Sequence, residues 1–194
     1  MIKAVLALAS VLCAIGAKAA QPAAKSWLDR PLASWNEPVR PIPSPTPAGE
    51  TIAEMGKRCN LVVRRGTAAE RAMADAGWLP YLHVDREIVE RDVEIIGAMT
   101  GADGMCRPSG YNIFVFVAGR FAGTLAPLAV PGGGDGTVGA VRLGGDDTIV
   151  AEFARYDEGA PACCPSGRVR VRYRIDRAGP QAVVVPVSLQ SAPR

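Results

Sequence analysis

The cysteines are the residues of this chain best suited to chemistry. Besides Cys13 near the start, the sequence holds Cys59, Cys106 and the adjacent pair Cys163-Cys164. Cysteines of an exported chain normally become structural disulfides. Neighbouring residues of an extended strand point to opposite sides, and a disulfide between them would strain the backbone. We therefore expect Cys59 and Cys106 each to bond one member of the pair, in either of the two possible orders.

The sequence lacks the residue patterns that a metal site or a catalytic site would need. His83 is the single histidine and no C-x-x-C is present, so zinc binding and an activated thiol are both poorly supported. Asp135, Asp146 and Asp147 lie in glycine-rich loops without the ligand spacing of an EF-hand, which favours a role in turns. No nucleophile elbow or metalloprotease helix motif occurs. We predict no catalytic residue, metal site or cofactor.

A row of arginines is the one candidate binding site. Arg168, Arg170, Arg172 and Arg174 alternate with apolar residues, which predicts a strand with one buried face and one wet face. Their side chains would lie about 7 Å apart. The row is either a solvated face that pairs with acids such as Glu152, or a groove for an anionic envelope component: a phospholipid headgroup, a phosphorylated glycan or peptidoglycan carboxylates. Alternation alone already requires polar residues there, which favours the first interpretation.

The start of the chain resembles an export signal. Residues 1–19 combine a basic start, an apolar run over 4–16 and the small-x-small pattern that ends at Ala19. The run is too short to span a bilayer. Leu12 is too bulky for the residue before an acylated cysteine, so we expect no lipid anchor at Cys13. The mature chain is predicted to be periplasmic or secreted, with no transmembrane segment.

Charge narrows the choice of partners. The formal net charge of +3 falls to +1 when residues 1–19, which include Lys3 and Lys18, are removed. A chain so close to neutrality lacks the overall field of a nucleic-acid binder. The remaining length of about 175 residues suits one domain with a real core.

Residues 20–51 form a proline-rich arm that also contains Trp27 and Trp35. Prolines exclude sheet and long helix from it. Exposed tryptophans are costly, so we expect the arm to dock on the body through a short helical turn. Residues 52–190 are predicted to form a single domain.

One helix and one hairpin are clearly indicated. Thr67 and Glu70 form a capping box for a helix over 68–76, and Gly77 suits its C-terminal end. Strands over 111–117 and 120–125 flank an Ala-Gly turn that fits a tight hairpin. That register pairs Phe116 with Phe121 and sets Gly123 opposite Phe114.

Further strands are indicated over 78–82, 92–98, 137–143, 148–156, 169–175 and 183–189. We predict an α+β fold: one antiparallel, mostly meandering sheet of six or seven strands, with one short helix packed on it and disulfides that staple it.

Several ordered motifs resemble the LppP/LprE family of bacterial cell-envelope lipoproteins. The likeness extends over roughly residues 27–178 and rests on Trp35-Asn36, Ala76-Gly77-Trp78, the stretches 103–108 and 114–125, Arg155-Tyr156 and Cys163-Cys164-Pro165-Ser166. The resemblance implies an exported envelope domain and assigns it no reaction. This chain departs from the family in lacking a convincing lipobox.

Taken together, these features predict a non-catalytic module of the envelope that binds a ligand or partner. Two alternatives are an envelope assembly protein that uses the arm and an edge near Pro186, and a hydrolase that uses His83 or the loop acids. The partner itself is not indicated beyond the anionic class that the arginine row would suit.

Overall fold

The computed structural model describes residues 26–46, 49–62, 64–80, 88–161 and 163–192. The predicted leader, with Cys13, and His83 lie outside the described residues. The predictions made for them are therefore not tested here.

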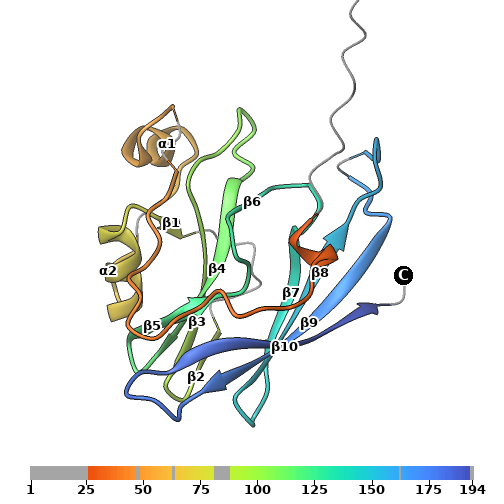
Figure 1. Ribbon diagram of the computed structural model, residues 1–194. Helices are drawn as coiled ribbons and strands as arrows, with labels where there is room; N and C mark the ends of the chain where they lie inside the picture. The colour runs from red at the N-terminus through yellow and green to blue at the C-terminus, as the bar shows by residue number, and fades with distance from the viewer. Residues whose placement is uncertain (1–25, 47–48, 63, 81–87, 162, 193–194) are drawn as a thin grey trace, which may run out of the picture.

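Two antiparallel sheets make up the described body (Figure 1). In the first sheet, β4 (Ser109–Val117) lies between β3 (Val93–Met99) and β5 (Arg120–Thr124); β1 (Leu79–Pro80) and β2 (Ile88–Glu90) pair with β3, and β6 (Val130–Pro131) pairs with β4. The second sheet is a meander of β7 (Val138–Leu143), β8 (Thr148–Arg155), β9 (Gly167–Asp176) and β10 (Val183–Ala192).

The α+β class and the antiparallel meander are confirmed, but the prediction of a single sheet is wrong. The two sheets bury a shared core, to which both contribute: Val93, Ile95, Ile113, Val115, Ile149, Ala151, Phe153, Val171, Tyr173 and Ile175. The alternating pattern of β9 gives that strand one buried face, and this face needs another apolar surface to cover it. The first sheet provides that surface, because its central strand β4 is apolar on both faces.

The other face of the first sheet is covered by short helices. In α2 (Ala68–Asp75), the predicted capping box of Thr67 and Glu70 is present, and Gly77 has φ +86°. Ala69 and Met73 of this helix pack on the sheet with Trp78, Phe114 and Phe116. A second helix, α1 (Ile52–Arg58), was not predicted, although Thr51 and Glu54 form the same capping box before it.

The hairpin of β4 and β5 shows why one glycine is required. Phe116 pairs with Phe121 as predicted, but a bulge shifts the register and sets Gly123 opposite Val115 rather than Phe114. A Cβ atom at Gly123, where φ is +140°, would lie 2.4 Å from Cγ of Asn36. The glycine therefore makes room for the N-terminal arm rather than for a phenylalanine ring.

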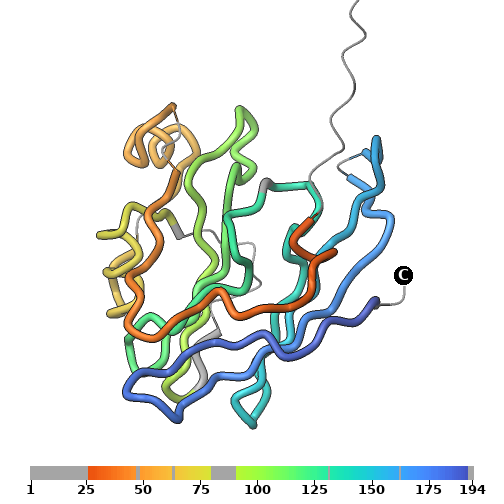
Figure 2. The backbone as a smooth tube through the Cα atoms, in the orientation of Figure 1, coloured from red at the N-terminus to blue at the C-terminus, as the bar shows by residue number. Residues whose placement is uncertain are grey.

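The arm docks on the body, beginning with the short helix η1 (Trp27–Asp29) beside β8 and continuing across to the helices of the first sheet (Figure 2). Leu28 is buried in the shared core. The ring of Trp27 meets that of Phe153 edge-on, with centroids 5.1 Å apart, and that of Trp35 at 5.4 Å. The tryptophans are thus part of the core.

Asn36 joins an edge strand of one sheet to an edge strand of the other. Its Nδ2 donates to the carbonyl oxygens of Thr124 in β5 and Val184 in β10, both at 2.9 Å. Its Oδ1 accepts from the backbone N–H of Thr124, also at 2.9 Å. Edge strands leave such backbone groups unpaired. The buried side chain of Asn36 makes the hydrogen bonds that a neighbouring strand would otherwise make, at the point where the two sheets meet.

Replacing Asn36 by alanine should destabilise the fold strongly. The change would strip buried backbone groups of Thr124 and Val184 of their partner, which costs about 2–4 kcal/mol in all. Chemical denaturation of the variant measures the loss. Glu37→Ala, at the neighbouring exposed position, is the matched control and should change the free energy of unfolding little. Equal stability of the two variants would contradict the bridging role.

Candidate functional site

The arginine row lies on the outer face of the second sheet. Along β9, Val169, Val171, Tyr173 and Ile175 are buried against the first sheet, and the arginines between them are exposed: Arg168, Arg170, Arg172 and Arg174. The predicted alternation is therefore present. The binding of an anionic component by the row stays a prediction.

A fifth arginine joins the row across the sheet. The register places Arg142 of β7 opposite Val150 of β8, and Val150 opposite Arg172. Opposed residues of neighbouring strands share a face, so Arg142, which is exposed, belongs to the same surface. The sequence carried a signal for it, because Arg142 lies between Val141 and Leu143 in the predicted strand. We call Arg142, Arg168, Arg170, Arg172 and Arg174 the arginine face.

Few acids offset these charges. On β8 and β10, the residues that the register sets opposite the row include one acid, Glu152; the others are Thr148, Val150, Ala154, Val185, Ser188, Gln190 and Ala192. Arg170 Nη2 lies 2.8 Å from Oε1 of Glu152, the pairing expected from the sequence. Arg174 meets Asp176 on its own strand at 3.2 Å. The face as a whole is cationic.

The carboxylates near the face are held in their charged form. The hydrogen bond from Arg170 lowers the pKa of Glu152, and the charges of Arg142 and Arg168 lower it further. Hydrogen bonding from Thr148 lowers the pKa of Asp146, with a smaller contribution from Arg172. Four arginines of the face thus lower the pKa values of these two acids, as nearby positive charges do.

A hollow of about 270 Å³ lies at the Arg168 end of this face. Its lining comes from the start of β7 and the residue before it, from β8, from the loop before β9 and from the start of β9: Thr137, Gly139, Ala140, Glu152, Phe153, Ala154, Pro165 and Arg168. The side chain of Arg168 could bind an anionic group placed there, with Glu152 limiting how much negative charge the hollow accepts.

Two of the loop acids make ion pairs within the fold. Asp147 bonds Arg177, which also bonds Asp92. Asp135 accepts hydrogen bonds from Nε of Arg155 at 2.8 Å and from the backbone N–H of Tyr156 at 2.9 Å. Across the residues that the structure describes, no three His, Cys, Asp or Glu side chains gather into a possible metal site.

The cysteine pairing differs from the prediction. Cys59 and Cys106 form a disulfide with each other, with Cα atoms 5.5 Å apart, and Cys163 and Cys164 are exposed free thiols. The prediction that each of the first two would bond one member of the pair is wrong. Cys59 caps the C-terminal end of α1, which lies beside the loop that holds Cys106, whereas the pair occupies the loop between β8 and β9.

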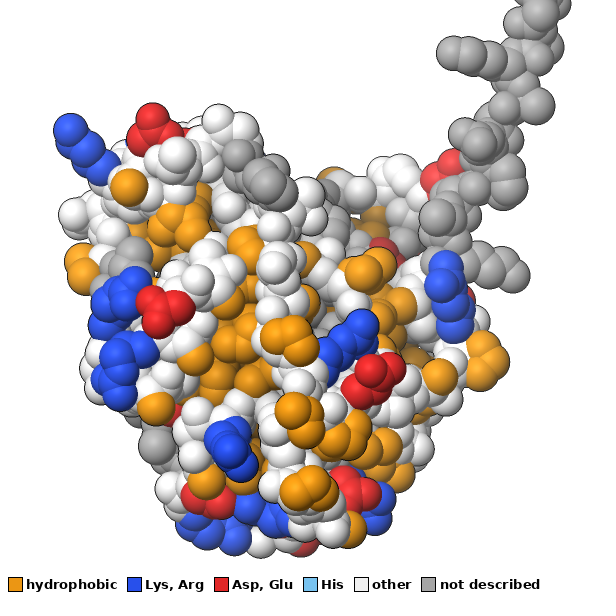
Figure 3. All heavy atoms as spheres, turned by 60° about the vertical axis from the view of Figure 1, so that its left-hand side comes forward, with side chains coloured by type: hydrophobic (Ala, Val, Ile, Leu, Met, Phe, Trp, Pro, Cys, Tyr) orange, Lys and Arg blue, Asp and Glu red, His pale blue; other side chains and the backbone are white. Residues whose placement is uncertain are grey.

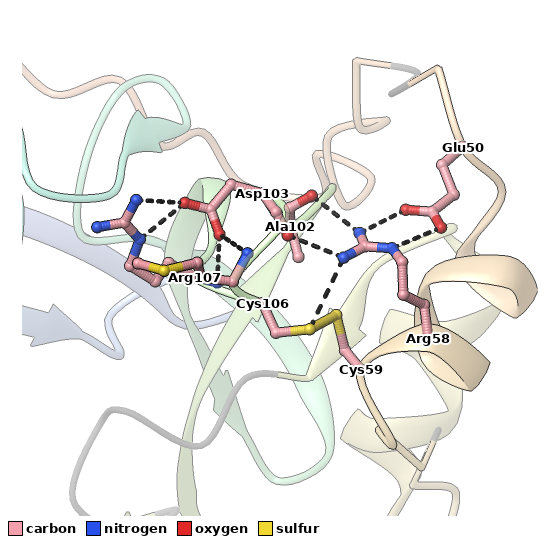
Figure 4. The surroundings of a disulfide bond; sticks show 8 residues. Glu50, Arg58, Cys59, Ala102, Asp103, Cys106 and Arg107 are labelled. Atoms are coloured by element: carbon pink, nitrogen blue, oxygen red, sulfur yellow. Dashed lines mark hydrogen bonds and ion pairs between the residues drawn. A yellow bond between two sulfur atoms is a disulfide. The ribbon is translucent and has the colours of Figure 1, made fainter.

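An arginine at this disulfide ties α1 to the β3–β4 loop (Figure 4). Arg58 donates to the carbonyl oxygens of Ala102 and Asp103 at 3.1 and 2.8 Å, and its Nη1 lies 3.7 Å from Sγ of Cys106. Glu50 accepts from the same guanidinium at 2.7 and 3.0 Å. These contacts place Arg58 beside the sulfur of Cys106 and join α1 to the loop that the disulfide also tethers.

The helix-bearing side of the molecule has a different surface. There, basic and acidic side chains are interspersed around a band of apolar ones (Figure 3). This contrasts with the second sheet, whose outer face collects arginines. The arginine face therefore differs from this side of the molecule in the predominance of basic side chains.

Comparison with known proteins identifies the region that carries this face. Residues 93–178 match the model of the LppP/LprE lipoprotein family. The family match runs from the start of β3 to just past β9, and it includes Cys106, the adjacent pair and the row on β9. The arm, both α-helices and Cys59 lie upstream of it.

The remaining comparisons add no further relatives. No curated protein and no solved structure matches the chain. The LppP/LprE match indicates a protein of the cell envelope. In the part of the chain that the structure describes, no helix has the length and apolar character to cross a bilayer.

The disulfide leads to a testable prediction. Peptide mapping without reduction should recover Cys59 linked to Cys106. Replacing both by serine should lower the free energy of unfolding by about 4 kcal/mol, from the loop-entropy relation applied to a sequence separation of 47. Replacing Cys163 and Cys164 by serine is the matched control and should leave the melting temperature nearly unchanged. A Cys59 peptide linked to the 163–164 segment would contradict the observed pairing.

Asp135 should contribute to stability in a pH-dependent way. Burial alone would raise its pKa, but hydrogen bonds from Ser26, the N–H of Tyr156 and Arg155 outweigh this and lower the pKa. Such a group stabilises the fold above its unfolded pKa, and the contribution disappears as the pH falls through its folded pKa.

Asp135→Asn should therefore cost on the order of 1 kcal/mol at neutral pH, and the difference from the wild type should shrink below about pH 4. Denaturation curves at a series of pH values measure this. Glu158→Gln, an exposed change in the β8–β9 loop, is the matched control for the loss of one carboxylate. A constant difference at every pH would rule out the proposed titration.

Proposed function

We propose that the domain is a non-catalytic binding module of the cell envelope, which contacts an anionic component through the arginine face. The observation that carries the proposal is the cationic outer face of the second sheet, where Arg142 and the row on β9 face solvent around Glu152. The family match supports the compartment.

The geometry of the face suits repeated negative charges. Successive arginines on one side of a strand lie about 7 Å apart, and Arg142 adds a charge two strands away. Guanidinium groups bind phosphate and carboxylate oxygens with paired hydrogen bonds. A surface or polymer that presents many such groups can contact several arginines at once, which an isolated anion cannot do.

The position of the arm favours this proposal over the assembly alternative. Trp27 and Trp35 pack against the shared core, and Asn36 bridges the sheets. An arm with these contacts supports the fold. Pro186, near the proposed edge, is buried in a β10 that pairs along β9. The arm is therefore already occupied within the fold, whereas β10 is the end strand of its sheet and its outer edge has no strand beside it among the described residues.

Binding should be sensitive to the charge of the face. Arg170→Gln combined with Arg172→Gln should abolish retention on vesicles that contain anionic phospholipid, or on isolated cell-wall sacculi. The melting temperature should change little, because exposed ion pairs contribute little to stability. Cosedimentation with each material measures retention and distinguishes a lipid from a wall component.

Three controls make the test specific. Arg30→Gln combined with Arg120→Gln removes the same charge at exposed sites outside the face and should retain binding. Glu152→Gln removes the acid within the face and should strengthen binding. Raising salt from about 0.1 to 1 M should release the wild type, because the screening length falls from about 10 to 3 Å. If the wild type shows no salt-sensitive retention on either material, the proposal fails.

A further inference from the structure

The loop between β8 and β9 presents two adjacent thiols at the surface. Cys163 and Cys164 are both exposed, and both are free. Cys59 and Cys106 are bonded to each other, so neither is available as a partner. Among the described residues, the only cysteine with which either thiol of the pair could form an internal disulfide is therefore the other one.

The backbone of this loop brings the two thiols together. Cys163 lies in a turn, which the N–H of Cys164 closes by donating to the carbonyl oxygen of Pro161 at 2.9 Å. In an extended strand neighbouring side chains would diverge, which was the basis of the incorrect pairing. In the turn, the neighbouring Cys163 thiol raises the pKa of the Cys164 thiol.

The turn is held on a fixed base. The hydroxyl of Ser166 accepts from the N–H of Asp157 at 2.8 Å and donates to the carbonyl oxygen of Arg155 at 3.1 Å. Arg155 and Gly167, the last residues of β8 and first of β9, pair with each other. The loop that carries the thiol pair is thus held at both ends by these contacts.

We propose that Cys163 and Cys164 form a redox site that closes reversibly to a disulfide between neighbours, by exchange with a disulfide on another molecule. One thiolate attacks the external disulfide, which forms a mixed disulfide and releases one external thiol. The second thiolate attacks the protein sulfur of that mixed disulfide and releases the other external thiol. The pair loses two electrons and two protons, which the external disulfide takes up.

The two cysteine pairs would then have different roles. Strain makes a disulfide easier to reduce, and strained or exposed disulfides are typically the labile or regulatory ones. A bond between neighbours in an exposed turn belongs to this class. The Cys59–Cys106 bond is half-buried and has Arg58 beside the sulfur of Cys106, and it belongs to the structural class.

The test equilibrates the full chain with glutathione buffers of graded ratio, traps free thiols with N-ethylmaleimide, and maps the peptides by mass spectrometry. The expected result is an internal Cys163–Cys164 bond in oxidising buffer. As the ratio of reduced to oxidised glutathione is raised, the Cys163–Cys164 bond should be reduced first. The ratio that reduces it should be about tenfold or more lower than the ratio that reduces Cys59–Cys106. Persistent glutathione adducts on the pair, intermolecular dimers through it, or thiols that stay free in every buffer would each overturn the proposal.

Single variants supply the matched controls. Cys163→Ser and Cys164→Ser each lack the resolving thiol, so each should retain glutathione as a stable mixed disulfide. Phenylarsine oxide, which is captured by paired thiols, should bind the reduced wild type and neither variant; equal binding to all three would overturn the proposal. Thiol–disulfide exchange at the pair should be the same in the double variant Arg170→Gln, Arg172→Gln as in the wild type. The redox proposal can therefore fail or succeed independently of the proposed binding function.

Discussion

The hydrogen bonds of Asn36 are the interaction on which the arrangement of the two sheets most depends. One amide side chain satisfies backbone groups of β5 and β10, which are edge strands of different sheets. Unpaired edge groups invite association with other chains, and buried ones cost free energy. Asn36 resolves both problems with a residue of the arm. Gly123 follows from it, because a side chain there would occupy the space of the amide.

Other contacts between the sheets reinforce this bridge. The hydroxyl of Tyr173 donates to the carbonyl oxygen of Leu125, and the hydroxyl of Tyr111 accepts from the N–H of Val138 at 2.7 Å. Gln181, in the turn after β9, donates to the carbonyl oxygen of Phe121 at 2.6 Å. Each joins the second sheet to the first through a polar group at the margin of an apolar core. The arm, through the rings of Trp27 and Trp35, completes that core.

Among the described residues, no helix or other sheet packs on the outer face of the second sheet. The first sheet is covered on one face by α2 and on the other by the second sheet. The second sheet has a partner on its inner face, and its outer face carries the arginines. The cysteines divide in a similar way: one pair is bonded where α1 meets the β3–β4 loop, and the other is exposed in the loop between β8 and β9. Structural and reactive features thus lie in separate places.

Local patterns in the sequence determined the elements: the Thr67–Glu70 cap, the hairpin turn at Ala118-Gly119, and the alternation that exposes the row on β9. These depend on residues close together in the chain, whose geometry is set by a few backbone angles. Tertiary structure alone decided that the strands divide into two sheets, that Arg142 joins the row, that Gly123 serves Asn36, and that Cys59 pairs with Cys106. Each of these depends on which distant segments pack together, and that choice follows from the burial of a shared core rather than from any local pattern.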